Sequence, residues 1–202
     1  MTERLYSTEQ YLRETSAQVV DVDADERLVL LDRTVVYPGG GGQPPDTGTL
    51  RVGSGTSEDA LTVLDARSDA RGVWHRIEGD LPPVGTPVEV AIDWERRHRL
   101  MRTHTAMHAL CGIVWDRYAS PVTGGNMEPG QGRLDFELPD WDPEDRAPIE
   151  AALNDALASA LPVEIAFLSR AEADADPSLI RTKVSLLPPT LIAPPPETRT
   201  SR

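Results

Sequence analysis

Cysteine is nearly absent from this 202-residue chain, whose single thiol belongs to Cys111. One cysteine cannot form a disulfide within the chain, so nothing in the sequence indicates an oxidising compartment. No apolar run approaches the ~20 residues that a membrane-spanning helix needs. The first residues also lack the pattern of a secretory signal peptide. We therefore expect a cytoplasmic protein that makes no contact with a membrane.

Basic residues are scarce as well, since 20 Lys+Arg stand against 33 Asp+Glu and the formal net charge is −13. Such a chain does not bind nucleic acid non-specifically through its bulk charge. An RNA partner would have to be held at a local basic surface. The hydrophobic content of 39% is ordinary for a globular protein, and the length suffices for one large domain or two small ones.

Short strand candidates fill the first ~90 residues, separated by turns that contain glycine and proline. Their ranges are 18–22, 27–36, 49–52, 61–64, 73–77 and 88–92. Short strands at this close spacing predict a small β-barrel or sandwich. His75 lies inside one of these strands, and we expect it to be a structural or surface histidine and not a metal ligand.

Four consecutive glycines at 39–42, followed by Gln43, interrupt the strands. Such a run forms neither a stable helix nor a central strand, because glycine loses too much backbone entropy on ordering. No Gly-Lys-Ser/Thr follows, so this is not the phosphate loop of a nucleotide hydrolase. Two interpretations stay open. The run is either a loose hairpin, or a loop whose backbone approaches a ligand while Gln43 supplies a fixed amide.

A histidine pair, His104 and His108, lies inside a helix expected over residues 93–115. Residues four apart on a helix are neighbours, with Cβ atoms ~5–6 Å apart. Both histidines fall on one stripe with apolar residues, so we expect both imidazoles to face the interior. They are either half of a zinc site or two histidines at the edge of the core that bond to the backbone. The other members of the stripe are Leu100, Met107, Cys111, Val114 and Trp115.

The first turns of the same helix hold a cluster of arginines. Asp93 can cap the helix. Two i,i+4 pairs, Asp93 with Arg97 and Glu95 with Arg99, have the favourable orientation. The cluster is therefore either a set of helix salt bridges or a surface that contacts phosphates. Its members are Arg96, Arg97, Arg99 and Arg102.

The rest of the chain alternates between strand and helix patterns. We expect a glycine-rich turn region at 121–132, a strand at 133–138 and a second helix that begins at 142–143. The apolar stripe of that helix should face the core. A strand at 163–167, a short helix capped by Ser169 and a proline-rich extended tail follow. The stripe consists of Ile149, Ala152, Leu153, Ala156, Leu157, Ala160 and Leu161.

Three runs, 31–48, 93–108 and 132–136, together carry a family resemblance. In order and spacing they resemble the AlaX family of free-standing alanyl-tRNA editing proteins, which are relatives of the editing domain of alanyl-tRNA synthetase. The resemblance implies an α+β fold. It places a small β-barrel with the glycine-rich loop at 1–90, an α+β editing domain with the histidine helix at 91–185 and the proline-rich tail at 186–202.

The resemblance also implies a reaction, in which the ester that joins serine or glycine to alanine tRNA is hydrolysed with the help of zinc. A synthetic pocket for alanine cannot strongly reject glycine or serine, so a second site must remove the errors. Zinc would activate the water or anchor the amino group of the substrate. The implied catalytic residues are Thr34, as the hydroxyl that recognises serine, and Gln43, near the ester. The implied substrate-binding residues are Gly40, Gly41, Gly42, Arg99 and Arg102, and the implied zinc ligands are His104 and His108.

One part of the family pattern is missing. Family members complete the zinc site with a C-x-x-x-H arrangement downstream of a segment like 179–184, whereas no histidine follows His108 here. Two protein ligands are fewer than the three or four of a firm zinc site. The alternative to an editing hydrolase is therefore a truncated or degenerate member that keeps the fold, with or without tRNA binding, but not catalysis. A third interpretation is an unrelated metal-dependent hydrolase that acts on a small molecule.

Overall fold

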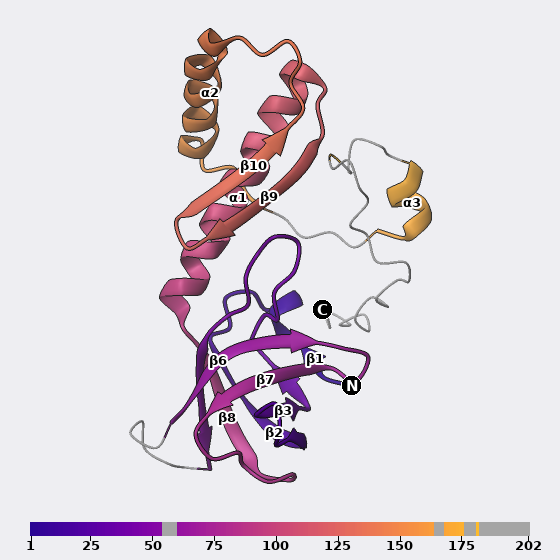
Figure 1. Ribbon diagram of the computed structural model, residues 1–202, viewed down its shortest axis with the longest axis vertical. Coiled ribbons are helices and arrows are strands. Elements are labelled where there is room, and N and C mark those ends of the chain that lie inside the picture. The colour runs from indigo at the N-terminus through magenta and orange to yellow at the C-terminus, as the bar shows by residue number, and fades with distance from the viewer. Residues whose placement is uncertain (54–59, 164–167, 176–180, 182–202) are drawn as a thin grey trace, which may run out of the picture. The chain divides into compact units, whose positions relative to one another are not determined.

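A computed structural model describes residues 1–53, 60–163, 168–175 and 181 of the chain (Figure 1). Contacts between Cα atoms divide the chain into two compact units. The first unit comprises Met1–His104 and Asn126–Gly132, and the second comprises Thr105–Gly125 and Arg133–Arg202.

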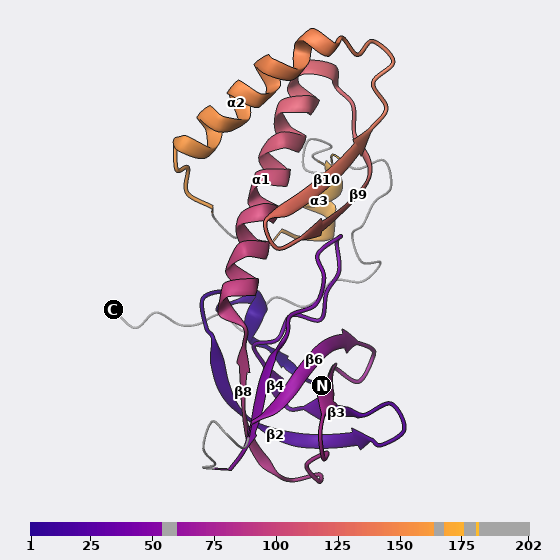
Figure 2. The same cartoon turned by 60° about the vertical axis from the view of Figure 1, so that its left-hand side comes forward.

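A closed barrel of six strands forms most of the first unit (Figures 1 and 2). The strands follow the order β2-β3-β7-β6-β5-β8, and each pairs with its neighbours in antiparallel fashion. The α+β fold class and its N-terminal barrel are therefore confirmed. The barrel strands are β2 (Glu14–Asp23), β3 (Leu28–Leu31), β5 (Gly48–Val52), β6 (Leu61–Ser68), β7 (Val73–Glu78) and β8 (Pro87–Ile92).

The single strand expected over 27–36 is wrong, because the chain breaks it at Asp32. The Asp32 side chain accepts a hydrogen bond from the backbone N–H of Gln18 at 2.7 Å. After this break, the short strand β4 (Arg33–Thr34) pairs in parallel with β1 (Glu3–Arg4) and not within the barrel. A short 3-10 helix, η1 (Leu5–Ser7), follows β1.

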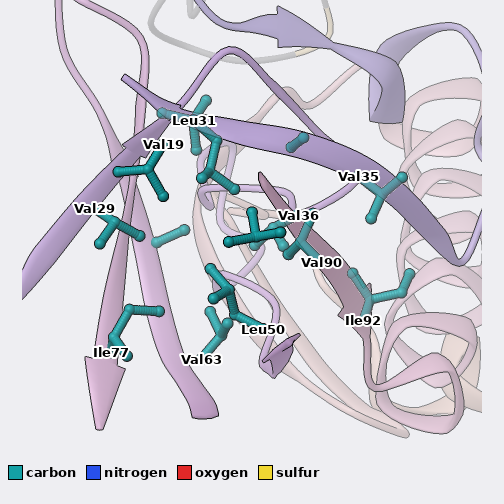
Figure 3. Close-up of a cluster of buried hydrophobic side chains, with 14 residues drawn as sticks. Val19, Val29, Leu31, Val35, Val36, Leu50, Val63, Ile77, Val90 and Ile92 are labelled. Carbon is teal, nitrogen blue, oxygen red and sulfur yellow. The ribbon is translucent and has the colours of Figure 1, made fainter. Parts of the chain in front are cut away.

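Inward-facing side chains from the strands fill the barrel (Figure 3). The pattern is clearest in β8, where Val88, Val90 and Ile92 are buried and alternate with more exposed residues. This alternation follows from the two-residue period of a strand. The labelled core residues are Val19, Val29, Leu31, Val35, Val36, Leu50, Val63, Ile77, Val90 and Ile92.

Helix α1 (Trp94–Tyr118) follows β8 directly. The Asp93 side chain accepts a hydrogen bond from the N–H of Arg96 at 3.0 Å, which confirms its expected capping role. Leu100, Cys111 and Val114 are buried as expected, but His108 is exposed, so the prediction that both imidazoles face the interior is wrong. Positions four apart differ by about 40° around a helix, and the edge of the buried face runs between His104 and His108.

Beyond α1 the chain forms a two-stranded sheet of β9 (Val122–Glu128) and β10 (Gln131–Phe136). The expectation of a plain turn region over 121–132 is therefore wrong. Its glycines serve a close backbone approach, since a Cβ on Gly125 would lie 2.6 Å from the carbonyl oxygen of Arg133.

A 3-10 helix, η3 (Pro143–Asp145), leads into α2 (Arg146–Ala158). The expected apolar stripe is only partly covered: Ile149 is buried, but Leu157 is 45% exposed, and Leu161, which lies beyond the end of α2, is 70% exposed. The expectation of a fully core-facing stripe is thus wrong.

The last described helix is α3 (Arg170–Ala175). Ser169 caps it as expected: the N–H of Glu172 donates to Ser169 Oγ, and the N–H of Ser169 donates to Glu172 Oε2. Within the described residues, no helix is long and apolar enough to cross a membrane. Most of the expected strand at 163–167 and of the segment 179–184, and all of the tail at 186–202, lie outside the described residues.

Candidate active site

The glycine-rich run forms a tight turn. Gly40 and Gln43 exchange two backbone hydrogen bonds of 3.0 Å, so the chain reverses over Gly41 and Gly42. The φ angles of these two glycines are +58° and +84°, as a two-residue hairpin turn of the primed type requires. Gly40, Gly41 and Gly42 are all exposed. The run is therefore a hairpin, and its expected role in binding substrate stays a prediction.

Gln43, at the end of this turn, meets His104 of α1. His104 Nδ1 lies 2.8 Å from Gln43 Oε1, and both residues are half-buried. An amide oxygen only accepts hydrogen bonds, so Nδ1 carries the proton and the lone pair of the neutral ring is on Nε2. The structure thus brings together two predicted site residues that are 61 positions apart in the sequence.

A buried ion pair between Asp46 and Arg97 fixes the base of the loop. Arg97 Nε lies 2.9 Å from both carboxylate oxygens of Asp46, and the side chains are 5% and 1% exposed. A terminal nitrogen of Arg97 also donates to the carbonyl of Val35 at 2.8 Å, and the N–H of Tyr37 donates to Asp46 at 2.8 Å. The expected pairing of Arg97 with Asp93 is wrong, because the guanidinium turns toward the loop and away from its own helix.

This ion pair positions the glycine turn relative to α1. Arg97 precedes His104 by about two helical turns, so both side chains lie on the face of α1 that meets the loop. Asp46 follows Gln43 on the other side of the contact. The pair therefore sets the distance between the turn and the helix, and sequence reasoning missed it because a pairing across 51 positions leaves no local pattern.

Thr34 of β4 and His75 of the barrel strand β7 form a second pair, which is completely buried, with both residues 0% exposed. Thr34 Oγ1 lies 2.8 Å from His75 Nε2, and His75 Nδ1 lies 3.3 Å from the carbonyl oxygen of Val29. Burial lowers the pKa of His75 to about 4, against the smaller raising effect of the Val29 carbonyl. The ring is neutral at pH 7, and the expectation that His75 is structural is confirmed.

The predicted arginine cluster divides into different environments. Arg99 is exposed and pairs with Glu95 at 2.9 Å, which confirms the expected helix salt bridge. Arg96 is half-buried and donates to the carbonyl of Pro45 at 3.3 Å. Arg102 is exposed. An exposed pair such as Glu95 with Arg99 adds little stability, so it leaves Arg99 able to exchange its partner for a phosphate.

The described residues offer few of the ligands that the expected zinc site needs. Among the described residues, no group of three or more His, Cys, Asp or Glu side chains is placed to hold a metal ion. The tautomer of His104 is the one that metal-ligating histidines adopt when their second nitrogen is hydrogen-bonded. Cys111 is buried, and desolvation raises the pKa of its thiol, as fits a core residue. The two histidines alone do not make a complete site, and zinc binding by His104 and His108 stays a prediction.

Comparison with known proteins places this arrangement in a family. The alanyl-tRNA editing protein AlaX-M of Methanosarcina barkeri is 37% identical over 187 residues, which cover 90% of this chain and 75% of that protein. The chain belongs to the family of AlaX-type alanyl-tRNA editing proteins. The AlaX-M protein of Saccharolobus solfataricus is 34% identical, again over 90% of this chain and 75% of that protein.

The synthetase relationship is also present. The alanine–tRNA ligase of Pyrobaculum calidifontis is 35% identical over 193 residues, which cover 93% of this chain but only 21% of the ligase. The chain therefore matches one section of a much longer synthetase. No family model matches the chain.

Proposed function

We propose that this protein hydrolyses the ester bond of mischarged alanine tRNA, with serine or glycine as the wrong amino acid. Membership of the AlaX family supports the reaction. The observation that carries the proposal is the contact between Gln43 of the glycine turn and His104 of α1, which joins two separate family signatures in one site. The comparisons do not support the alternative of a member without catalysis.

The site chemistry follows from the direction of the Gln43–His104 hydrogen bond. Because Gln43 Oε1 accepts from His104, the side chain presents its NH2 group as a donor. A donor held beside the ester carbonyl stabilises the negative charge that develops when water attacks the carbonyl carbon. The water oxygen bonds to that carbon, the bond between the carbon and the ribose oxygen breaks, the ribose oxygen gains the proton that the water loses, and the free amino acid leaves.

Other groups in the proposal bind and orient the substrate. The backbone of Gly40, Gly41 and Gly42 is exposed and would let the aminoacyl end approach closely, most openly at Gly41, where no atom lies within 4 Å of an added Cβ. Arg99 and Arg102 would contact tRNA phosphates, as befits the basic segment of an acidic protein. No step is assigned to zinc, and recognition of serine by direct contact with Thr34 stays a prediction of the resemblance.

Deacylation assays with alanine tRNA charged with serine, glycine or alanine test the proposal. We expect the serine and glycine esters to be cleaved well above the buffer rate, and the correct alanine ester to be spared. Gln43→Ala should remove most of this activity, whereas Gln131→Ala, which alters an exposed glutamine in β10, should not. Cleavage of neither wrong ester by the wild-type protein would contradict the proposal.

A further inference from the structure

The hydrogen bonds around Thr34 can be assigned a direction. The carbonyl oxygen of Val29 only accepts, so His75 Nδ1 must carry the ring proton, and Nε2 of the neutral ring is an acceptor. The hydroxyl of Thr34 therefore donates its only proton to His75 Nε2 at 2.8 Å. Its oxygen in turn accepts from the N–H of Val36 at 3.0 Å.

This accounting leaves Thr34 without a proton to offer a substrate. The residue is also fully buried, so no water molecule reaches its hydroxyl or its methyl group. A buried hydroxyl of this kind stabilises the protein around it, because leaving either partner unsatisfied would be costly. Its influence on the site must pass through the backbone that it holds.

That backbone leads straight into the candidate active site. The bond from Val36 to Thr34 Oγ1 fixes the chain where β4 ends. The next contacts along the chain are the carbonyl of Val35 with Arg97, and the N–H of Tyr37 with Asp46. Three consecutive residues before the glycine run are thus each held by a buried side chain.

We propose that Thr34 and His75 form one positioning unit, which sets the entry to the glycine turn and acts on both substrates alike without touching either. His75 anchors the unit to β3 through Val29 and to β7 through its own backbone. The inference rests on the proposed editing function. It gives Thr34 a different part from direct recognition of serine, and it adds His75 to the residues on which the reaction depends.

The test compares kcat and KM for serine- and glycine-charged alanine tRNA across matched variants. Thr34→Val removes the hydroxyl at constant shape, and His75→Phe removes the acceptor. We expect each to lower kcat about tenfold for both esters, since small misplacements of site groups are costly, with little change in KM or in the serine-to-glycine ratio. The double variant should be no worse than either single one, because the two side chains act as a unit.

Conservative replacements separate positioning from a general loss of folding. Thr34→Ser keeps the hydroxyl, and His75→Gln keeps an acceptor near the position of Nε2, so both should restore most of the activity. A Thr34→Val variant that loses serine cleavage but keeps glycine cleavage, while His75→Phe leaves both unchanged, would overturn the inference in favour of direct recognition.

A readout without substrate keeps this inference distinct from the proposed function. Hydrogen exchange of the Val36 amide should accelerate in both Thr34→Val and His75→Phe, because the hydroxyl that accepts from it is removed in one and loses its partner in the other. Unchanged exchange in His75→Phe would contradict the coupling, whatever the activity. If the wild-type protein cleaves neither ester, yet exchange of the Val36 amide is faster in both variants, the result would refute the editing function and leave the coupling of Thr34 and His75 intact.

Discussion

Two histidine-containing pairs in the first unit differ in their access to solvent. Thr34 and His75 are completely buried, and each polar atom of the pair bonds to another protein group. Gln43 and His104 are half-buried, and the hydrogen bond between them joins the exposed glycine turn to α1. The two contacts have the same length of 2.8 Å.

The difference shows that two hydrogen bonds of equal length can have different roles. One can hold the backbone on which a site depends, and the other can belong to the groups that contact the substrate. A sealed pair cannot meet a substrate, but it can fix the backbone that carries the site. A half-buried pair contacts solvent, and a substrate can replace that solvent when it binds. The buried Asp46–Arg97 pair connects the two, because it touches Val35 and Tyr37 on one side and shares α1 with His104 on the other.

The largest effect is expected from breaking that connection. Asp46→Asn leaves the Arg97 guanidinium buried without its carboxylate, which should lower the free energy of unfolding by about 3–5 kcal/mol. Urea denaturation at pH 7 measures it. The control is Glu95→Gln, which breaks an exposed pair on the same helix and should cost less than about 1 kcal/mol. Equal stabilities of the two variants would show that the buried pair is not what holds the loop to the helix.

The sealed pair should make stability depend on pH. The pKa of His75 is about 4 in the folded protein against 6.5 for the free side chain. Above pH 6.5 neither state binds a proton there, whereas between pH 6.5 and about 4 only the unfolded state does, so stability falls as the pH is lowered. The loss amounts to roughly 3 kcal/mol.

Urea unfolding at pH 7 and pH 4.5 measures this loss. His75→Phe should show a smaller loss than the wild-type protein, since the titrating group is gone, whereas Thr34→Val, which retains the histidine, should not lose the pH dependence. Identical pH dependence in the wild-type and His75→Phe proteins would mean that His75 is not held neutral by burial.

The accessible pair should affect activity and leave stability nearly intact. His104→Ala is expected to lower kcat/KM for serine-charged alanine tRNA on the order of 100-fold, the usual scale for a group that positions a catalytic donor. Its matched control is His98→Ala, which alters a histidine of the same helix that stacks on Trp94 at 5.5 Å. A similar loss in both variants would place the effect in the helix and not in the contact with Gln43.

The smallest effect concerns the exposed arginines. Arg99→Glu should weaken the binding of tRNA several-fold and reduce the salt slope by about one phosphate contact. Arg67→Glu, which alters an exposed arginine of the barrel, is the control. Binding that is unchanged by Arg99→Glu at every salt concentration would leave this arginine as a partner of Glu95 only.

Local patterns predicted the elements that depend on neighbouring residues. The strand at 88–92, the cap at Asp93 and the cap at Ser169 all follow from spacing within a few positions. Composition and spacing singled out Gln43 and His104, the family resemblance gave them roles in one site, and the structure joins them. Spacing alone does not predict which side chains far apart in the sequence contact each other.

The errors illustrate that limit. Arg97 has a possible partner in Asp93 on its own helix, but the Asp93 side chain accepts from the N–H of Arg96 and Arg97 bonds to both oxygens of the buried Asp46. His108 shares a stripe with His104 but lies across the edge of the buried face. Gly124 and Gly125 indicate a turn by composition, but both lie in strand β9, where Gly125 approaches the backbone of β10 closely.

The comparison of the two pairs is tested most directly by NMR contacts to a bound substrate analogue. The ligand is adenosine that carries serine through a non-hydrolysable 3′-amide, added to the wild-type protein. We predict intermolecular nuclear Overhauser effects between the ligand and the side-chain amide protons of Gln43, and none to the methyl group of Thr34. Contacts from the serine moiety to the Thr34 methyl group, with none to Gln43, would contradict the division into an accessible pair that meets the substrate and a sealed pair that holds the site.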